Sequence, residues 1–182
     1  MIRLASFSAT LDHISASVGK YVCWLSLLMV LLQFMLVVAR YVFGIGAIAM
    51  QETIIYCFGL LFLLGAADTL RRGGHVRVDI FYARGSAKIK AVIDLLGTLF
   101  FLIPVCVGIF LLSWSYVAGS WHILEGSRES TGLPFLYLLK SMLLLFCVMM
   151  TLQGISTIFR SLVILFSSGA HSAIPPKPGA SA

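Results

Sequence analysis

Residues 65–82, GAADTLRRGGHVRVDIFY, separate two long apolar segments and gather a sudden cluster of charge. Two adjacent arginines, a glycine pair and a segment of alternating charged and apolar residues follow one another within this stretch. In membrane proteins, basic residues between apolar segments indicate which side of the bilayer a loop faces. We therefore expect this turn to set the orientation of the chain.

The composition is that of a membrane protein. Of the 182 residues, 60% are hydrophobic and 11% are charged, and the mean hydropathy is +1.02. A soluble domain carries about 25% charged residues, which it needs to cover its surface. Because each membrane crossing takes about 20 apolar residues, the length allows one all-α integral membrane domain with a handful of spanning helices.

Four apolar segments predict four transmembrane helices within one domain at residues 21–166. Pro104 lies in the middle of the third segment and predicts a kink there, because proline removes a backbone hydrogen bond. Aromatic residues flank the first and third segments, as they do at membrane interfaces. The predicted spans are residues 21–43, 47–70, 91–117 and 133–159.

Three further segments lie outside the predicted spans. Residues 1–20 are mildly amphipathic and form either a short helix lying in the interface or a frayed cytoplasmic tail. Residues 71–90 predict a charged turn with a short amphipathic connector at the interface. Residues 167–182 are rich in proline and predict a disordered cytoplasmic tail.

The distribution of basic residues predicts the orientation. If both termini and the turn at residues 71–90 share one side, that side carries ten of the 13 Lys and Arg residues. The positive-inside rule then places both termini and this turn in the cytoplasm. The loop at residues 119–132 faces the opposite side.

The sequence argues against several functional classes. The net charge of +6 is explained by orientation signals, and no zinc-finger spacing or basic–aromatic pattern predicts nucleic-acid binding. The His residues lie outside the apolar segments, which argues against a haem anchor. No HExxH, GxSxG or P-loop motif occurs, and the four cysteines are isolated in apolar runs. We therefore expect no enzyme activity, catalytic residue, metal site or cofactor.

Three charged residues stand close to the predicted extracytoplasmic side. Arg40 and Glu52 lie on opposite arms of one hairpin at similar depth, so that they form an ion pair or each reach water alone. Lys140 lies about two turns into the last span. It either extends towards the loop that contains Glu125 and Glu129 or faces a protein neighbour.

Four motifs together resemble one family of membrane proteins. ARYVF (39–43) ends the first span, and Glu52 follows near the start of the second. GAADTLRRGGHVRVDIF (65–81) crosses the charged turn, and GLP (132–134) opens the last span. The combination resembles the small membrane subunit of tripartite ATP-independent periplasmic (TRAP) transporters, over about residues 24–160.

The resemblance implies a function in transport. Such systems take up organic acids with a periplasmic substrate-binding protein and a sodium gradient, in the bacterial inner membrane. A large permease subunit holds the substrate and sodium sites, and the small subunit packs against it as a scaffold. Because no large domain is fused here, the resemblance implies a separate large partner. The alternative is a membrane anchor or assembly subunit of another inner-membrane complex.

The resemblance also implies structural or partner-contact roles for particular residues. Arg40 and Glu52 brace the periplasmic hairpin, and Glu129 and Lys140 are candidate contacts at the periplasmic face. A further group is expected to fix the cytoplasmic turn against lipid headgroups or the large subunit. Its members are Arg71, Arg72, His75, Arg77 and Asp79.

Overall fold

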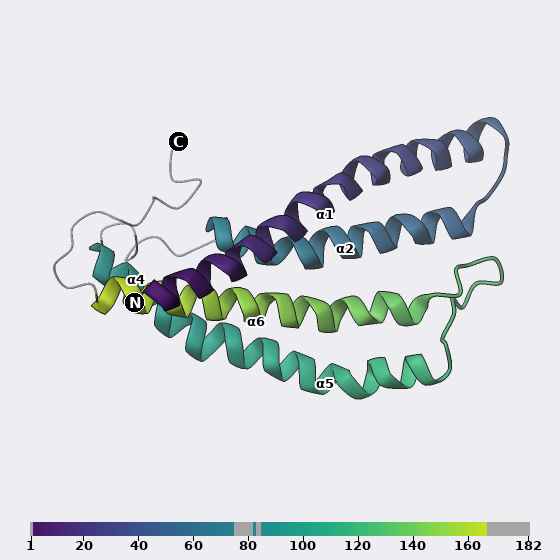
Figure 1. Ribbon diagram of the computed structural model, residues 1–182. Coiled ribbons are helices and arrows are strands. Elements are labelled where there is room, and N and C mark those ends of the chain that lie inside the picture. The colour runs from purple at the N-terminus through teal and green to yellow at the C-terminus, as the bar shows by residue number, and fades with distance from the viewer. Residues whose placement is uncertain (1, 75–81, 83–84, 167–182) are drawn as a thin grey trace.

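The chain is all-α in a computed structural model that describes residues 2–74, 82 and 85–166. The helices are rods that run along the length of the molecule (Figure 1). They are α1 (Ile2–Val42), α2 (Ile48–Arg72), α4 (Ala87–Gly97), the π-helix η1 (Thr98–Leu102), α5 (Ile103–His122) and α6 (Leu136–Phe166).

Four helical segments are long and apolar enough to cross a membrane, which confirms the prediction of a four-span α-helical fold. The third is built from α4, η1 and α5 without a break. The segments are Ser6–Val42, Ile48–Arg72, Ala87–His122 and Leu136–Phe166.

The sequence predicts a boundary at residue 20, whereas α1 is continuous from Ile2 to Val42. Its buried side chains include Ser8, Leu11, Ser15 and Val22, which recur at helical spacing across that boundary. No proline interrupts this face. At a rise of about 1.5 Å per residue, α1 is about 60 Å long, roughly twice the hydrocarbon thickness of a bilayer.

Helix α6 is the centre of the bundle, because it contacts α1, α2, α4, η1 and α5. Helices α1 and α2 form an antiparallel hairpin that leans away from α5 and α6 towards the turn that joins them (Figure 1). The core therefore lies where the helices converge. It is built from Val22 of α1, Leu64 and Ala67 of α2, Cys106 of α5, and Met149 and Met150 of α6.

The third span widens into the π-helix η1, which ends two residues before Pro104. The backbone N–H of Ile103 bonds to the carbonyl of Thr98, five residues back. Proline clashes with the preceding turn of an α-helix and lacks its own N–H, and a π-turn is one way in which a helix accommodates such a site. The predicted feature at Pro104 was a kink; what the structure shows just before this residue is a π-turn.

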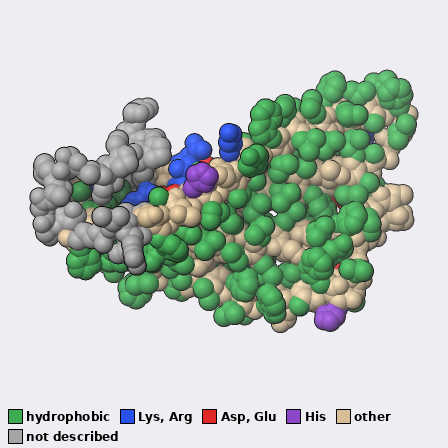
Figure 2. Space-filling model, viewed as in Figure 1, with side chains coloured by type: hydrophobic (Ala, Val, Ile, Leu, Met, Phe, Trp, Pro, Cys, Tyr) green, Lys and Arg blue, Asp and Glu red, His purple; other side chains and the backbone are tan. Residues whose placement is uncertain are grey.

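The face of the molecule seen in Figure 2 is apolar over most of its length. Large hydrophobic side chains point outwards from all spans; Phe34, Phe62 and Leu112 are each at least 66% exposed. In water such a surface would aggregate. This surface therefore suits contact with lipid or with a partner protein in the membrane.

Candidate functional site

Charged side chains of the described residues pair at the two ends of the bundle. We call the end where α1 begins and α2 and α6 finish the basic end. The other end, with the α1–α2 turn and the α5–α6 loop, is called the loop end (Figure 1).

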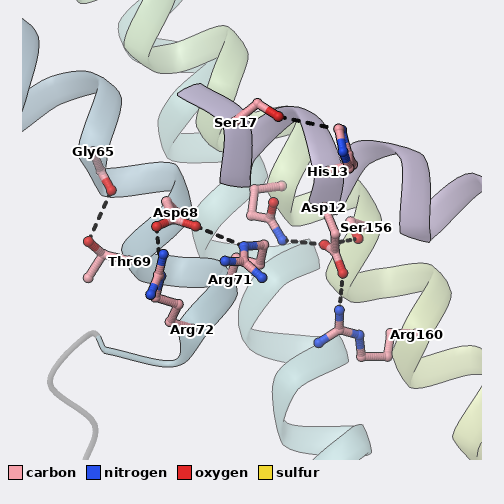
Figure 3. A network of polar contacts seen from close by, with 11 residues as sticks. Asp12, His13, Ser17, Gly65, Asp68, Thr69, Arg71, Arg72, Ser156 and Arg160 are labelled. Carbon is pink, nitrogen blue, oxygen red and sulfur yellow. Dashed lines mark hydrogen bonds and ion pairs between the residues drawn. The ribbon is translucent and has the colours of Figure 1, made fainter. Parts of the chain in front are cut away.

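At the basic end, the carboxylate of Asp12 on α1 joins three side chains of α6 (Figure 3). It accepts hydrogen bonds from Gln153 Nε2 at 2.9 Å and Ser156 Oγ at 2.8 Å, and from the Arg160 guanidinium. Gln153, Ser156 and Arg160 are spaced i, i+3 and i+7, which puts them on one face of α6. Ser8, one turn before Asp12, also contacts Ser156, with their Oγ atoms 3.1 Å apart.

The second polar group at the basic end lies at the C-terminus of α2. Arg71 Nε donates to Asp68 Oδ1 at 2.8 Å, and Arg72 Nε donates to Asp68 Oδ2 at 2.7 Å (Figure 3). Gly73 ends the helix in the left-handed conformation, with φ of 73°. Asp68 thus neutralises the charge of one of the two arginines and fixes the positions of both side chains at the end of α2.

Helix α1 passes close to this group at Gly19. A Cβ atom at Gly19 would lie 2.6 Å from the Cβ of Asp68 and 2.8 Å from its Oδ2. Any side chain here would push α1 away from α2 or displace the carboxylate. The missing side chain therefore lets the two helices approach each other over the Asp68 ion pairs.

At the loop end, Glu52 of α2 holds the loop between α5 and α6. Its carboxylate accepts hydrogen bonds from the Ser127 hydroxyl and from the backbone N–H of Leu133, the latter at 2.6 Å. The sequence left two alternatives for Glu52, an ion pair with Arg40 or contact with water alone, and these hydrogen bonds match neither. Arg40 is exposed near the end of α1, and no salt bridge joins it to Glu52 in the part of the chain that the structure describes.

The α5–α6 loop lies within hydrogen-bonding distance of Glu52. The loop offers a hydroxyl and a backbone donor that would otherwise lose water, and a carboxylate satisfies both. Arg40 keeps its exposed position, where a long side chain can reach water or headgroups.

Lys140 of α6 binds Glu125 in the same loop, with Nζ 2.5 Å from Oε2. Its ammonium also lies 4.0 Å from the centroid of the Tyr116 ring, a cation–π geometry. Ser120 donates a second hydrogen bond to Glu125 at 2.6 Å. The hydrogen bonds from Lys140 and from Ser120 lower the pKa of the Glu125 carboxyl below its ordinary value.

Four of the predicted site residues contact other parts of the chain through their side chains, whereas Arg40 is exposed. Arg71 and Arg72 meet at Asp68, and Glu52 and Lys140 hold the α5–α6 loop. Glu129 is exposed on that loop, where its backbone N–H donates to Ser127. His75, Arg77 and Asp79 lie outside the described residues.

The Asp12 group was not among the predicted site residues. A signal for it exists in the sequence, because Gln153, Ser156 and Arg160 place polar groups on one face of an otherwise apolar helix. Asp12 itself lies 148 residues before Arg160. Which polar groups on distant helices meet depends on the packing of α1 against α6.

Between the two ends, the described part of the molecule offers little for polar chemistry. A pocket of about 210 Å³ between α5 and α6 is lined by apolar atoms, including those of Cys106, Phe110, Cys147 and Leu152. Within the described ranges, no group of three or more His, Cys, Asp and Glu residues is close enough to hold a metal ion. The pocket therefore suits an apolar chain rather than a charged molecule.

Comparison with known proteins identifies the family. A model of the family described as tripartite ATP-independent periplasmic transporters, DctQ component, matches residues 29–163, from the middle of α1 into the last turns of α6. No curated protein and no solved structure matches the chain. The family match confirms the resemblance found in the sequence motifs. Since the match spans well over half of the sequence, the chain belongs to the DctQ component family of tripartite ATP-independent periplasmic transporters.

Proposed function

We propose that the chain is the small subunit of a sodium-coupled transporter for organic acids, and that it scaffolds a separate large permease subunit. Family membership makes it a small transmembrane component of a tripartite ATP-independent periplasmic transporter, multi-pass in the bacterial inner membrane. The sodium coupling, the class of substrate and the scaffolding role are the proposal. A periplasmic binding protein is the proposed source of the substrate.

The observation that carries the proposal is how the polar side chains are used. The carboxylates of Asp12, Glu52, Asp68 and Glu125 accept hydrogen bonds from other side chains or backbone groups of this chain. An organic acid and its sodium ions need unsatisfied donors and oxygen ligands near the middle of the membrane. The pocket between α5 and α6 offers an apolar lining instead. Substrate handling therefore fits a partner subunit better than this one.

A scaffold also needs a surface for its partner. The half of the α1–α2 hairpin near the loop end leans away from α5 and α6 (Figure 1). It presents Val30, Phe34 and Met35 of α1, and Phe58 and Phe62 of α2, each at least 55% exposed. Such a broad apolar face supports packing against a large membrane subunit through shape and dispersion contacts.

Gentle solubilisation and affinity purification of the tagged chain test the proposal. We expect a stoichiometric large permease among the proteins identified by mass spectrometry. The co-purified complex, reconstituted in liposomes with its binding protein, should take up an organic acid only with an inward sodium gradient. The acid is chosen by screening carboxylic acids for thermal stabilisation of the binding protein. Recovery of a redox enzyme instead would support the alternative of a membrane anchor.

The proposed orientation has its own test. In a variant without native cysteines, a single cysteine at Glu129 or at Ile45 should react with a membrane-impermeant maleimide added to intact spheroplasts. A cysteine at Lys88 should react only after the membrane is opened. If only Lys88→Cys were labelled in intact spheroplasts, the chain would have the opposite orientation, and the prediction from the positive-inside rule would be wrong.

A further inference from the structure

Two cations of different helices lie at the same depth at the basic end. At a rise of about 1.5 Å per residue, Lys20 lies about 33 Å from the end of α1 at Val42. By the same rise, Arg72 lies about 36 Å from the start of α2 at Ile48. Because the hydrocarbon core is about 30 Å thick, both side chains stand at the level of lipid headgroups when the loop end stands at the other surface.

The close approach at Gly19 brings these two positions together. Gly19 lies against Asp68 Oδ2, which is the oxygen that accepts from Arg72. Lys20 is the next residue of α1 and is exposed. Figure 2 shows Lys and Arg side chains gathered where the apolar surface of the bundle ends.

Asp68 accepts a hydrogen bond from Nε of Arg72, which leaves the terminal guanidinium nitrogens of Arg72 able to donate to another group. The contact is made by Nε at 2.7 Å, and the side chain is 59% exposed. Arg71 is held by the other carboxylate oxygen and is only 15% exposed. The three groups carry a net charge of one positive unit, and the outward-facing part of that charge belongs to Arg72. A guanidinium fixed at Nε presents its terminal nitrogens in a defined plane, which is the geometry that binds phosphate oxygens.

An apolar surface continues from this cationic pair towards the middle of the membrane. Trp24 follows Lys20 by one helical turn on the same face of α1 and is 66% exposed. Tyr21 is 74% exposed beside it. Aromatic residues of this kind lie at the boundary between headgroups and acyl chains. A ligand that meets both features has an anionic head and an apolar tail.

We propose that Lys20 and Arg72 bind the phosphate of an anionic phospholipid, with its acyl chain along Trp24. Arg71 stays paired with Asp68 and keeps the carboxylate from repelling the lipid. This site goes beyond the proposed transport function and does not depend on it, since it uses the residues of this chain alone.

The test compares lipid binding by variants of the full purified chain, together with any partner that co-purifies. Native mass spectrometry measures retention of phosphatidylglycerol and phosphatidylcholine, and thermal unfolding measures stabilisation by each lipid. The variants are Lys20→Gln, Arg72→Gln and the double variant. Arg128→Gln is the control, because it removes the same charge from an exposed residue at the loop end.

We expect phosphatidylglycerol binding to weaken roughly fivefold for each cation removed, because each basic residue near an anionic headgroup contributes attraction of that order. Phosphatidylcholine binding and the Arg128→Gln variant should change less than twofold. Arg72→Gln leaves Arg71 paired with Asp68, and Lys20→Gln breaks no internal contact of the described residues. The Lys20 variant therefore decides the question if the double variant fails to fold.

Three results would overturn the inference. The wild-type chain could retain both lipids equally, or Arg128→Gln could weaken binding as much as Arg72→Gln does. Competition by millimolar inorganic phosphate, equal to that by phosphatidylglycerol, would show a site for a free anion rather than for a lipid.

Discussion

Replacing Asp12 with alanine should weaken the packing of α1 against α6. Asp12 is the acceptor for Gln153, Ser156 and Arg160, which come from one face of α6. The variant removes all three bonds with one substitution. Alanine is a good helix former, so the helix itself remains intact.

The magnitude follows from what each partner loses. Gln153 is 1% exposed, and its Oε1 has no hydrogen-bond partner in the described structure. Losing Asp12 would leave Nε2 unpaired as well, at a cost of about 1–3 kcal/mol for a buried polar group. Arg160 is 32% exposed, so it can turn to water, and its ion pair contributes about 1 kcal/mol or less. With the Ser156 bond at about 1 kcal/mol, the sum is about 2–5 kcal/mol.

Buried cysteines provide the assay. Cys57, Cys106 and Cys147 are buried and free, whereas Cys23 is exposed. A thiol-reactive fluorogenic dye therefore reports unfolding in detergent as a rise in signal over the Cys23 background. At about 2–4 °C per kcal/mol for a chain of this size, Asp12→Ala should lower Tm by about 10 °C. His13→Ala is the control, because His13 is exposed and its one hydrogen bond among the described residues is to Ser17, at 3.5 Å.

Two results would refute the reasoning. Asp12→Ala could unfold within 2 °C of His13→Ala, which would mean that the bonds to α6 contribute nothing net. In a double-mutant cycle, Asp12→Ala and Arg160→Gln could also add fully, although residues in one contact network are expected to couple. Asp12→Asn should fall between alanine and wild type, because it keeps an acceptor oxygen and loses the charge.

Three further predictions concern the other contacts. Gly19→Ala should destabilise the chain by about 1–3 kcal/mol, measured with the same dye, because its Cβ would overlap Asp68. Glu52→Gln should speed proteolysis of the α5–α6 loop several-fold, since an amide cannot accept two strong hydrogen bonds from Ser127 and Leu133 as a carboxylate does. The lowered pKa of Glu125 predicts stability that is fully present above its ordinary value of 4.5 and is lost as pH falls below that value; Tm measured against pH should show this loss, and Glu125→Gln should remove it.

Each of these has a matched control. Gly65→Ala changes a glycine of α2 whose Cβ would meet no atom within 4 Å, and an equal loss of stability there would contradict the steric argument. Glu129→Gln changes an exposed carboxylate of the same loop. Proteolysis as fast as in Glu52→Gln would rule out a specific role of Glu52 in holding the loop. An acid-induced loss of Tm that is identical in wild type and Glu125→Gln would assign the titration to another group.

The fold could be predicted because its signals are local. An apolar segment of sufficient length forms a spanning helix wherever it lies in the chain. The start of α1 was harder, since Lys20 and the polar residues before it resemble a boundary. Ser8 and Ser15 are nevertheless buried against other helices. Their burial depends on tertiary contacts that a polar segment does not announce.

The polar contacts were less predictable than the helices. Arg40 and Glu52 are neighbours across a turn, and proximity in sequence suggested a pair. The actual partners of Glu52 lie 75 and 81 residues away, on a loop whose position is set by the packing of α5 and α6. Lys140 illustrates the opposite case, because its reach towards the loop of Glu125 follows from its place two turns into the span.

The placement of the contacts at both ends bears on how such a subunit resists deformation. In lipid, apolar helices have no hydrophobic driving force to associate, so polar contacts between them help to fix how they pack. At the basic end, the hydrogen bonds of Asp12 fix the position of α1 along α6. At the loop end, the hydrogen bonds of Glu52 fix the position of α2 against the α5–α6 loop. Both must break for the hairpin to slide along α6. If the subunit acts as the proposed scaffold, these two sets of contacts would hold its outer apolar face at a constant tilt towards the large subunit.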